Sequence, residues 1–275
     1  MTSEKDTERL GDLLAHGRTS RIYSLKKGQV AKIFLDRRPQ KAIALEFRIT
    51  RLVHEAGYPS PTLHKLLSTQ QGNGFSYEWI PGHTLLDEVK GKPWRFLWAM
   101  NIFAQLHHQM HQLQVAKLPA QRQRLHDRID QSHQLGQKQK ELILKLLNNL
   151  PDGNFLCHGD FHPENIIIGS QSPVVIDWYN AVSGNPLCDV ARTVLLLTFS
   201  VVPKEVSFWE RKVVSLGRKY IPLETIYLRN YVRQNPFSQT ELQMWVTINL
   251  ASRLYEKIPG EEELLLKLLS QRIVS

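Results

Sequence analysis

The alternation of apolar and polar positions predicts a small sheet lobe at the start of the chain. Period-two alternation bounded by glycines and polar turns is typical of short strands. Pro39 opens a helical pattern that extends to about Ala56, and Gly57 then ends it. Four strands are expected around this helix, over residues 22–25, 30–35, 63–69 and 75–80. Two strand pairs and one helix describe a small α+β lobe with an antiparallel sheet.

After Pro81-Gly82 the pattern becomes helical. Apolar residues at helical spacing predict helix over 94–113 and again over 121–150. Further helices are expected from Pro186 to the end, broken at Pro203, Pro222, Pro236 and Pro259-Gly260. We therefore expect two lobes that meet at Pro81-Gly82. A sheet lobe would cover residues 1–81, and a larger, mostly helical lobe would cover residues 82–275.

One stretch interrupts the helices and gathers polar side chains. Between Phe155 and Tyr179 the chain reads FLCHGDFHPENIIIGSQSPVVIDWY. Two apolar strands are expected in it, over 166–168 and 174–176. Asn165 precedes the first strand and Asp177 follows the second, so the hairpin should make their side chains neighbours. Oxygen ligands of this kind suit Mg²⁺. Asp160 lies five residues before Asn165, close enough to share such a site without being a ligand.

The composition indicates an ordinary globular protein. The 275 residues are 42% hydrophobic and 22% charged. The N-terminus has no apolar segment typical of a secretory signal, and the longest apolar run, 194–202, is far short of the ~20 residues that a membrane helix needs. Cys157 and Cys188 form no CxxC pair, which fits a reducing compartment better than a disulfide framework. We expect a cytoplasmic protein with no membrane partner.

The net charge of +9 raises the question of nucleic-acid binding. The excess lies in the first half of the chain, because residues 151–275 carry 12 basic and 13 acidic side chains. No zinc-finger spacing, RNP-like aromatic motif or long Lys/Arg run accompanies it. A solvated basic surface that steers anionic ligands is the favoured interpretation, and no nucleic-acid partner is expected.

Several motifs now resemble one known family. The segment 158–165, HGDFHPEN, resembles the catalytic loop of the protein-kinase-like fold in the variant of aminoglycoside phosphotransferases and choline kinases. VIDW at 175–178 resembles the family's magnesium segment, and GNPLCDVAR at 184–192 resembles the motif that follows it. GRTSRIY at 17–23 and AKIF at 31–34 resemble the nucleotide hairpin and the strand with the phosphate lysine. The resemblance extends from about residue 10 to 260 and implies a two-lobed ATP-dependent phosphotransferase.

The family's roles can be carried over to matching residues. Asp160 resembles the catalytic aspartate, which accepts or orients the proton of the attacking hydroxyl. Asn165 and Asp177 resemble the Mg²⁺ ligands. Lys32 resembles the lysine on the α- and β-phosphates of ATP, and Glu46 the carboxylate that pairs with it. Taken alone, an exposed strand lysine and a solvated helix glutamate would be the simpler interpretation; beside the loop motif, the nucleotide roles are favoured.

Four further residues are expected to contact the nucleotide. Glu78 and Ile80 lie in the segment that resembles the adenine-binding linker, and would contribute main-chain atoms. The first hairpin lacks a full GxGxxG, so Ser20 or backbone amides would cover the phosphates. His162 either donates to the γ-phosphoryl oxygens or braces the loop. Asp189 is expected to brace the catalytic loop from the following helix.

A histidine cluster offers a competing site. His107 and His111 stand at i and i+4 of a predicted helix, which is a spacing that binds zinc. No HExxH carboxylate or third ligand is apparent, so packed or surface histidines are favoured. Neither a Walker A motif nor a GxSxG elbow is present.

The sequence thus predicts a magnesium- and ATP-dependent kinase of a small hydroxylated molecule. The alternative is a nucleotide-binding pseudokinase that serves as a regulatory or scaffolding module. Such proteins commonly lack one of four residues, all of which this chain retains: Lys32, Asp160, Asn165 and Asp177. Residues 151–275 have a net charge of only −1, several of their acids are committed to the motifs, and most of the others are scattered among basic residues. A metabolic hydroxyl compound is therefore expected rather than a polycationic aminoglycoside. The oligomeric state and a preference for ATP over GTP stay open.

Overall fold

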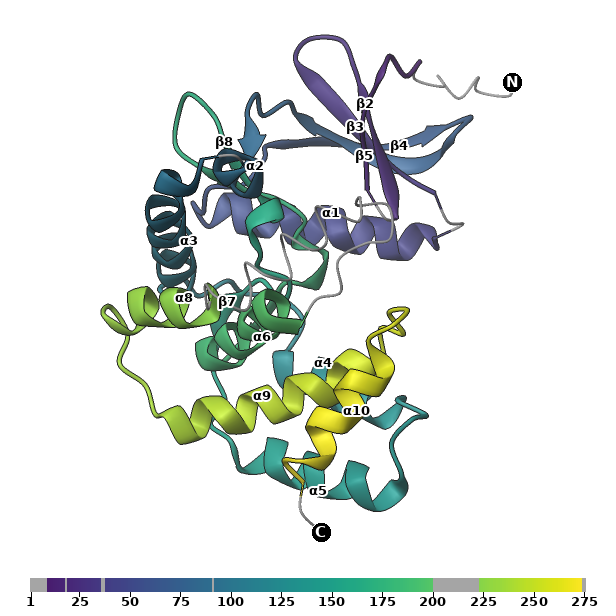
Figure 1. Ribbon diagram of the computed structural model, residues 1–275. Coiled ribbons are helices and arrows are strands. Elements are labelled where there is room, and N and C mark those ends of the chain that lie inside the picture. The colour runs from purple at the N-terminus through teal and green to yellow at the C-terminus, as the bar shows by residue number, and fades with distance from the viewer. Residues whose placement is uncertain (1–8, 18, 36–37, 91, 200–222, 274–275) are drawn as a thin grey trace. The chain divides into compact units, whose positions relative to one another are not determined.

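A computed structural model describes the chain in two compact units (Figure 1). The described residues are 9–17, 19–35, 38–90, 92–199 and 223–273. One unit comprises Met1–Glu88 with Glu164–Tyr179, and the other comprises Val89–Pro163 with Asn180–Ser275. An antiparallel sheet in the first unit and a mostly helical second unit confirm the expected α+β class. Some expectations fall on residues outside the described ranges, namely Arg18, Pro203 and Pro222.

The first unit is built on a five-stranded antiparallel sheet in the order β1-β2-β3-β5-β4. Its strands are β1 (Leu13–His16), β2 (Ser20–Ser24), β3 (Gln29–Phe34), β4 (Leu63–Thr69) and β5 (Gly72–Glu78). Helix α1 (Gln40–Glu55) begins directly after Pro39, as the sequence predicts, and lies along the sheet (Figure 1). The short edge strand β1 was not expected, because its four residues show no alternation of apolar and polar types.

The two faces of β3 contact different groups. Ala31 and Ile33 pack with Leu67 in one apolar cluster. Phe34 belongs to a second cluster, with side chains of α1 and β5. Successive side chains of a strand point to opposite faces, so Lys32 shares the face of Phe34 and projects toward α1.

A second, three-stranded sheet adds the polar hairpin to the first unit. It has the order β6-β8-β9, with β6 (His83–Thr84), β8 (Ile166–Ile168) and β9 (Val174–Val175). Helix α2 (Leu85–Val89) follows β6. The Val175 amide donates to the Pro59 carbonyl at 2.9 Å, and Trp178 packs edge-on against Tyr58. The hairpin therefore joins the loop after α1, although more than a hundred residues separate them in the sequence.

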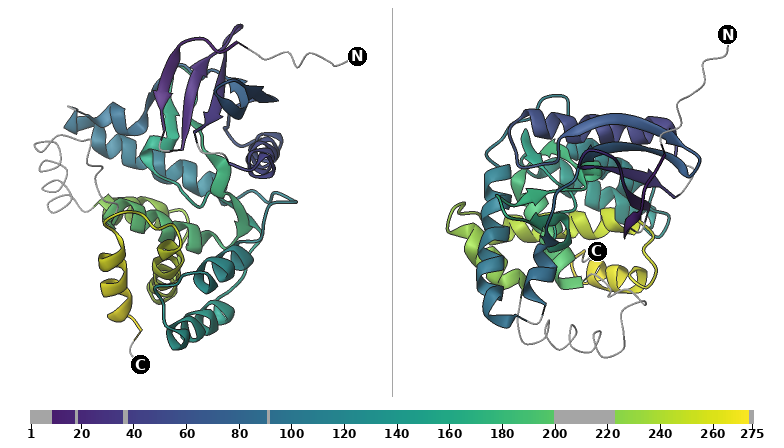
Figure 2. Two further views of the ribbon diagram at one scale, coloured as in Figure 1. Left: turned by 90° about the vertical axis from the view of Figure 1, so that its right-hand side faces the viewer. Right: turned by 90° about the horizontal axis from the view of Figure 1, so that it is seen from above.

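Helices make up most of the second unit (Figure 2). They are α3 (Phe96–Met110), α4 (Gln121–Asp130), α5 (Gln137–Asn149), α6 (Pro186–Phe199), α8 (Leu223–Val232), α9 (Gln239–Leu254) and α10 (Glu262–Ser270). Helix α9 packs against α4, α5, α6 and α10, and is almost wholly buried from Trp245 to Leu254. Strands β7 (Phe155–Cys157) and β10 (Val182–Gly184) form a short antiparallel pair that the sequence did not predict.

One helix prediction was wrong. The segment 121–150 forms two helices, α4 and α5, rather than one continuous helix. Gly136, the N-cap residue of α5, has an extended backbone, and its amide is bound by the Gln139 side chain. Glycine weakens a helix interior, and a glutamine three residues later supports a helix start.

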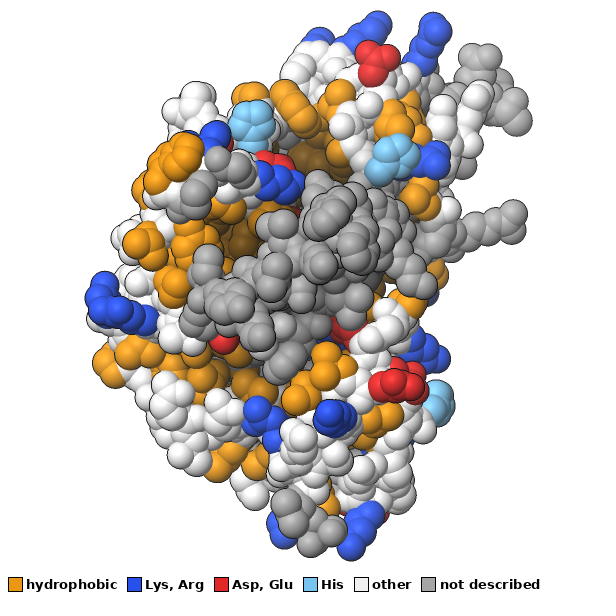
Figure 3. Space-filling view, in the orientation of Figure 1, with side chains coloured by type: hydrophobic (Ala, Val, Ile, Leu, Met, Phe, Trp, Pro, Cys, Tyr) orange, Lys and Arg blue, Asp and Glu red, His pale blue; other side chains and the backbone are white. Residues whose placement is uncertain are grey.

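The surface of the described chain is mixed in character. Figure 3 shows lysine and arginine side chains scattered singly or in small groups over one face. Among the described helices, none combines the length and hydropathy that crossing a bilayer requires.

Gly74 is required where β5 passes β3, because a Cβ at this position would overlap the Lys32 carbonyl oxygen. We predict that Gly74→Ala lowers the free energy of unfolding by roughly 2 kcal/mol or more, since backbone must shift to admit the methyl group. Gly136→Ala is the matched control, because its Cβ would meet nothing closer than 3.6 Å. Urea denaturation of both variants tests this; equal stability would contradict the close-approach argument.

Candidate active site

Three segments of the first unit converge on Lys32. The Lys32 Nζ donates to Glu46 Oε1 at 2.7 Å and to Asp177 Oδ1 at 3.0 Å. Glu46 comes from the middle of α1, and Asp177 is the second residue after β9. The ammonium is thus shared between a buried carboxylate and one that is 46% exposed. The structure therefore brings together three of the residues that the sequence singled out.

Electrostatics keeps this cluster charged. Burial lowers the pKa of Lys32, but the carboxylates of Asp177 and Glu46 outweigh burial and raise it overall. Burial also raises the pKa of Glu46, against the opposing effect of the Lys32 ammonium. With Nζ at hydrogen-bond distance we take the pair as ionised at neutral pH. Arg38 Nη1, 3.8 Å from Glu46 Oε2, adds a second positive charge.

The hairpin mouth pairs the backbone of Asn165 with that of Ile176, the residue before Asp177. The Ile176 amide donates to the Asn165 carbonyl at 2.9 Å, which brings the residue before β8 next to the residue after β9. Asp177 has φ 64°, a left-handed conformation that Asp tolerates better than most residues. The buried Trp178 fixes this turn, because its indole N–H donates to the Val175 carbonyl at 3.0 Å.

The other expected nucleotide contacts lie around the same sheet. Ser20 is buried at the start of β2, and its carbonyl accepts from the Gly17 amide at 2.8 Å. Glu78 ends β5 with its amide bonded to the Thr62 carbonyl at 3.0 Å. Ile80 follows two residues later and is half-buried.

In the second unit, Asp160 stands on a loop with an anchored apolar neighbour. Phe161 is fully buried, and its ring stacks at 4.6 Å from Phe103 and 4.2 Å from His107, measured between ring centroids. Asp160 remains 28% exposed, with His162 Nε2 at 3.8 Å from its Oδ2. Asp160 is therefore accessible to solvent, while the next side chain, Phe161, anchors the loop in the core.

Gly159 is needed for the course of this loop. Its φ of 75° lies in the left-handed region that favours glycine, and a Cβ would come within 2.5 Å of the Asn180 carbonyl oxygen. The loop therefore passes closer to residue 180 than any side chain at position 159 would permit.

Helix α6 holds the loop through three side chains of one helical face. Asp189 accepts the amides of His158 and Gly159, at 2.6 and 2.8 Å. Four residues further on, Thr193 Oγ1 donates to the Phe161 carbonyl at 3.1 Å. Arg192, between them, donates from Nε to the Gly159 carbonyl at 3.3 Å. The bracing role of Asp189 was expected from the sequence, but those of Arg192 and Thr193 were not. Their i+3 and i+4 spacing from Asp189 was the available signal.

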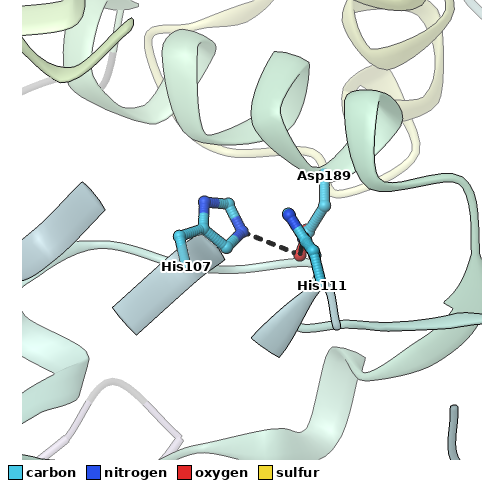
Figure 4. Close-up of side chains that lie close together, drawn as sticks. All are labelled: His107, His111 and Asp189. Atoms are coloured by element: carbon cyan, nitrogen blue, oxygen red, sulfur yellow. Dashed lines mark hydrogen bonds and ion pairs between the residues drawn. The ribbon is translucent and has the colours of Figure 1, made fainter. Parts of the chain in front are cut away.

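The expectation that no third ligand accompanies the histidine pair was wrong. His107, His111 and Asp189 are all buried, and their ligand atoms lie within 4.8 Å of one another. Figure 4 shows the His107 ring turned toward the Asp189 carboxylate, with His111 beside it. The carboxylate comes from α6, 78 residues beyond His111, so sequence spacing could not reveal it.

Hydrogen bonding accounts for this cluster without a metal ion. The Nε2 atoms of His107 and His111 lie 3.1 and 3.3 Å from Asp189 Oδ2. Their Nδ1 atoms lie 2.7 Å from the Tyr227 hydroxyl and 2.6 Å from the Tyr231 hydroxyl, respectively. Every ring nitrogen is therefore satisfied when Nε2–H donates to Asp189 and the tyrosine hydroxyl donates to Nδ1. The favoured interpretation of packed helix histidines holds for these two, and they hold in place the carboxylate that braces the loop.

The family comparison agrees with the motifs and the geometry. The model of the phosphotransferase enzyme family matches residues 12–207. The chain belongs to this family. No curated protein matches the sequence.

Solved structures of this family share the fold at low identity. A thermostable mutant of aminoglycoside phosphotransferase APH(4)-Ia, in a ternary complex with ADP and hygromycin B, is 15% identical with a TM-score of 0.63, covering 96% of this chain and 92% of that chain. Amicoumacin kinase hAmiN in complex with AMP-PNP, Ca²⁺ and Ami is 16% identical, with a TM-score of 0.58 and coverage of 94% and 86%. Aminoglycoside-3′-phosphotransferase of type VIII is 16% identical, with a TM-score of 0.57 and coverage of 90% and 93%. These likenesses establish the protein-kinase-like fold.

The histidine brace makes stability depend on pH. Burial lowers the pKa of His107 from 6.5 to about 3, so the folded chain keeps this ring neutral while the unfolded chain protonates it below about 6.5. The unfolded state then binds more protons, and the free energy of unfolding falls as pH drops. Between pH 6.5 and 5 we predict a loss of roughly 2 kcal/mol through this residue.

His107→Gln provides the comparison, because glutamine retains a donor and an acceptor but does not titrate. Urea denaturation at several pH values should show a smaller pH dependence for the variant than for the wild type. Identical slopes would contradict the assignment of a neutral buried His107.

Proposed function

We propose that this protein is a cytoplasmic, magnesium- and ATP-dependent phosphotransferase that phosphorylates a hydroxyl group of a small molecule. The observation that carries the proposal is the ion-pair cluster of Lys32 with Glu46 and Asp177, drawn from three distant segments of the first unit. Burying a lysine and a glutamate is costly unless a partner repays it. A buried ammonium held by a carboxylate is suited to bind the phosphates of a nucleotide. The two free cysteines, both buried, suit the reducing compartment that supplies ATP.

Each nucleotide-site residue receives a role that matches its surroundings. Lys32 binds the α- and β-phosphates of ATP, and Glu46 holds its ammonium in place. Glu78 and Ile80 offer main-chain groups to adenine, while Ser20 lies at the start of the strand expected beside the phosphates. These assignments make the first unit the nucleotide-binding part of the protein.

The donor set at the hairpin mouth fits Mg²⁺. Asn165 offers an amide oxygen and Asp177 a carboxylate, and hard oxygen ligands of this number are what Mg²⁺ takes from a protein when phosphates supply the rest. When bound, the ion neutralises negative charge on the β- and γ-phosphates. The hydrogen bond from the Ile176 amide to the Asn165 carbonyl supports this assignment, because it places the backbone of Asn165 beside the residue that precedes Asp177.

Asp160 of the second unit carries the chemical step. Its carboxylate accepts or orients the proton of the acceptor hydroxyl as that oxygen attacks the γ-phosphorus. His162, whose Nε2 lies 3.8 Å from Asp160 Oδ2, either donates to the transferred group or supports the carboxylate. Proton acceptance and nucleotide binding are thus assigned to different residues.

The acceptor we propose is a metabolic hydroxyl compound rather than an aminoglycoside. A polycation needs free carboxylates to pair with each ammonium. Several acids of the second unit are already engaged: Glu256 with three arginines, Glu261 with Arg253, Asp189 with the loop, and Glu241 with the Trp245 indole. Aromatic surface, such as the exposed Tyr255, suits a neutral or choline-like acceptor.

Two substitutions separate chemistry from binding. Asp160→Asn should lower kcat by about 10²–10⁴-fold while magnesium-dependent ATP binding persists, because only the proton acceptor is lost. Asp177→Ala should weaken magnesium-dependent ATP binding itself. Calorimetry and ADP-release kinetics measure the two effects. Wild-type protein that binds no ATP with Mg²⁺ would refute the enzyme proposal, whereas binding without any turnover would favour the pseudokinase alternative.

The acceptor class is open to a direct screen. ADP release in the presence of sugars, amino alcohols, nucleosides and aminoglycosides should give the highest kcat/KM with a metabolic hydroxyl compound. Reactions without acceptor correct for hydrolysis, and the Asp160→Asn protein corrects for contaminating kinases. Efficient turnover of kanamycin-like compounds alone would contradict the proposed acceptor.

A further inference from the structure

We infer that Arg192 is a positioning residue for the catalytic carboxylate, and that Glu256 keeps Arg192 in place. The inference rests on the proposed role of Asp160. It assigns to a side chain of α6 the orientation of the group that receives the acceptor's proton.

The Arg192 guanidinium contacts both the main chain and the side chain of the loop. Its Nε donates to the Gly159 carbonyl at 3.3 Å, and its Nη2 lies 3.9 Å from Asp160 Oδ1. The other carboxylate oxygen, Oδ2, has His162 Nε2 at 3.8 Å. Asp160 is therefore flanked on both oxygens. Arg192 is the better fixed of its two neighbours, because its side chain is only 6% exposed.

Glu256, at the end of α9, supplies the charge that a buried arginine needs. Its two carboxylate oxygens accept from Arg192 Nη2 at 2.7 and 2.9 Å. Burial raises the pKa of Glu256, but the three neighbouring arginines outweigh burial and lower it. Because two of its donors, Arg128 and Arg253, come from other positions, Glu256 is held independently of Arg192. A rigid carboxylate thus fixes a guanidinium, which in turn faces Asp160.

Loop attachment alone does not explain this arginine. Asp189 and Thr193 already bind the amides and a carbonyl of the loop backbone. Arg192 is the one of these three α6 residues whose charge reaches the catalytic carboxylate. Burying a guanidinium costs desolvation free energy and requires a partner such as Glu256. A small apolar residue would pack behind the loop backbone without that cost. The buried pair of Arg192 and Glu256 is explained if Arg192 holds the Asp160 carboxylate in position.

Positioning predicts a specific kinetic effect. A carboxylate displaced by about 1 Å can cost about a hundredfold in rate. Arg192→Met should therefore lower kcat by about 10- to 100-fold while the KM for ATP stays within about twofold, because the proposed ATP-binding residues other than His162, Lys32 among them, belong to the first unit. Arg192→Lys should recover part of kcat, since it returns a positive charge without the planar donor pair.

Arg122→Met is the matched control. It removes an arginine of the second unit whose contacts, with Asp152 and with the Leu147 and Leu150 carbonyls, lie outside the Arg192–Glu256 pair. We expect kcat close to that of the wild type. The double variant Arg192→Met with Glu256→Gln also takes the carboxylate away from Arg128 and Arg253, so its thermal midpoint should fall below that of Arg192→Met while kcat falls no further. A structural role would instead make kcat follow the thermal midpoint across all variants, and that outcome, or equal losses in the two methionine variants, would overturn the proposal.

A crystallographic readout is independent of turnover. The Asp160 side chain should occupy one rotamer in wild-type crystals, and should be displaced or divided between rotamers in Arg192→Met crystals. An unchanged Asp160 would overturn the positioning role. The two proposals can fail separately. If the wild-type protein phosphorylates no acceptor but Asp160 is still displaced in Arg192→Met crystals, the proposed function is overturned and the positioning role remains.

Discussion

The second unit depends on a single buried carboxylate, that of Asp189. It accepts two loop amides and two imidazole groups in the core, so four donors compensate its desolvation. The hydrogen bonds from His107 and His111 outweigh burial, which alone would raise its pKa, and keep the pKa of this carboxyl well below its usual range. The loop that carries Asp160 is attached to this anion, and α3, α6 and α8 meet around it.

The first unit also compensates the desolvation of a buried charge, but there the central group is a cation. There a cation, the Lys32 ammonium, is placed on the inner face of a sheet and compensated by carboxylates of α1 and the hairpin. In both units the charged group is brought to its partners by segments far apart in sequence. The charged groups of the candidate site therefore also fix how those segments pack.

The sequence sufficed for what local patterns and motifs encode. Helix α1, the β8–β9 hairpin and the α+β class follow from periodicity and from Pro and Gly signals, and the loop motif led to Lys32, Glu46 and Asp177, which the structure brings together. The short strands β1, β7 and β10 were missed because three or four residues carry too little periodicity. Glu256 is a partner of Arg192 across 64 residues, and only the packing of α9 on α6 creates that pair.

The spacing of Asp189, Arg192 and Thr193 along α6 limits how the sequence around the 158–161 loop can change during evolution. All three contacts depend on one helical face, and inserting a single residue ahead of them would turn that face by about 100°. Point substitutions can change these contacts one at a time, but a shift of register removes all three together. In related proteins, insertions and deletions should therefore be tolerated in the loops around α6 but eliminated by selection from its first two turns. The segment 189–193, DVART, should keep its length even where its residues change.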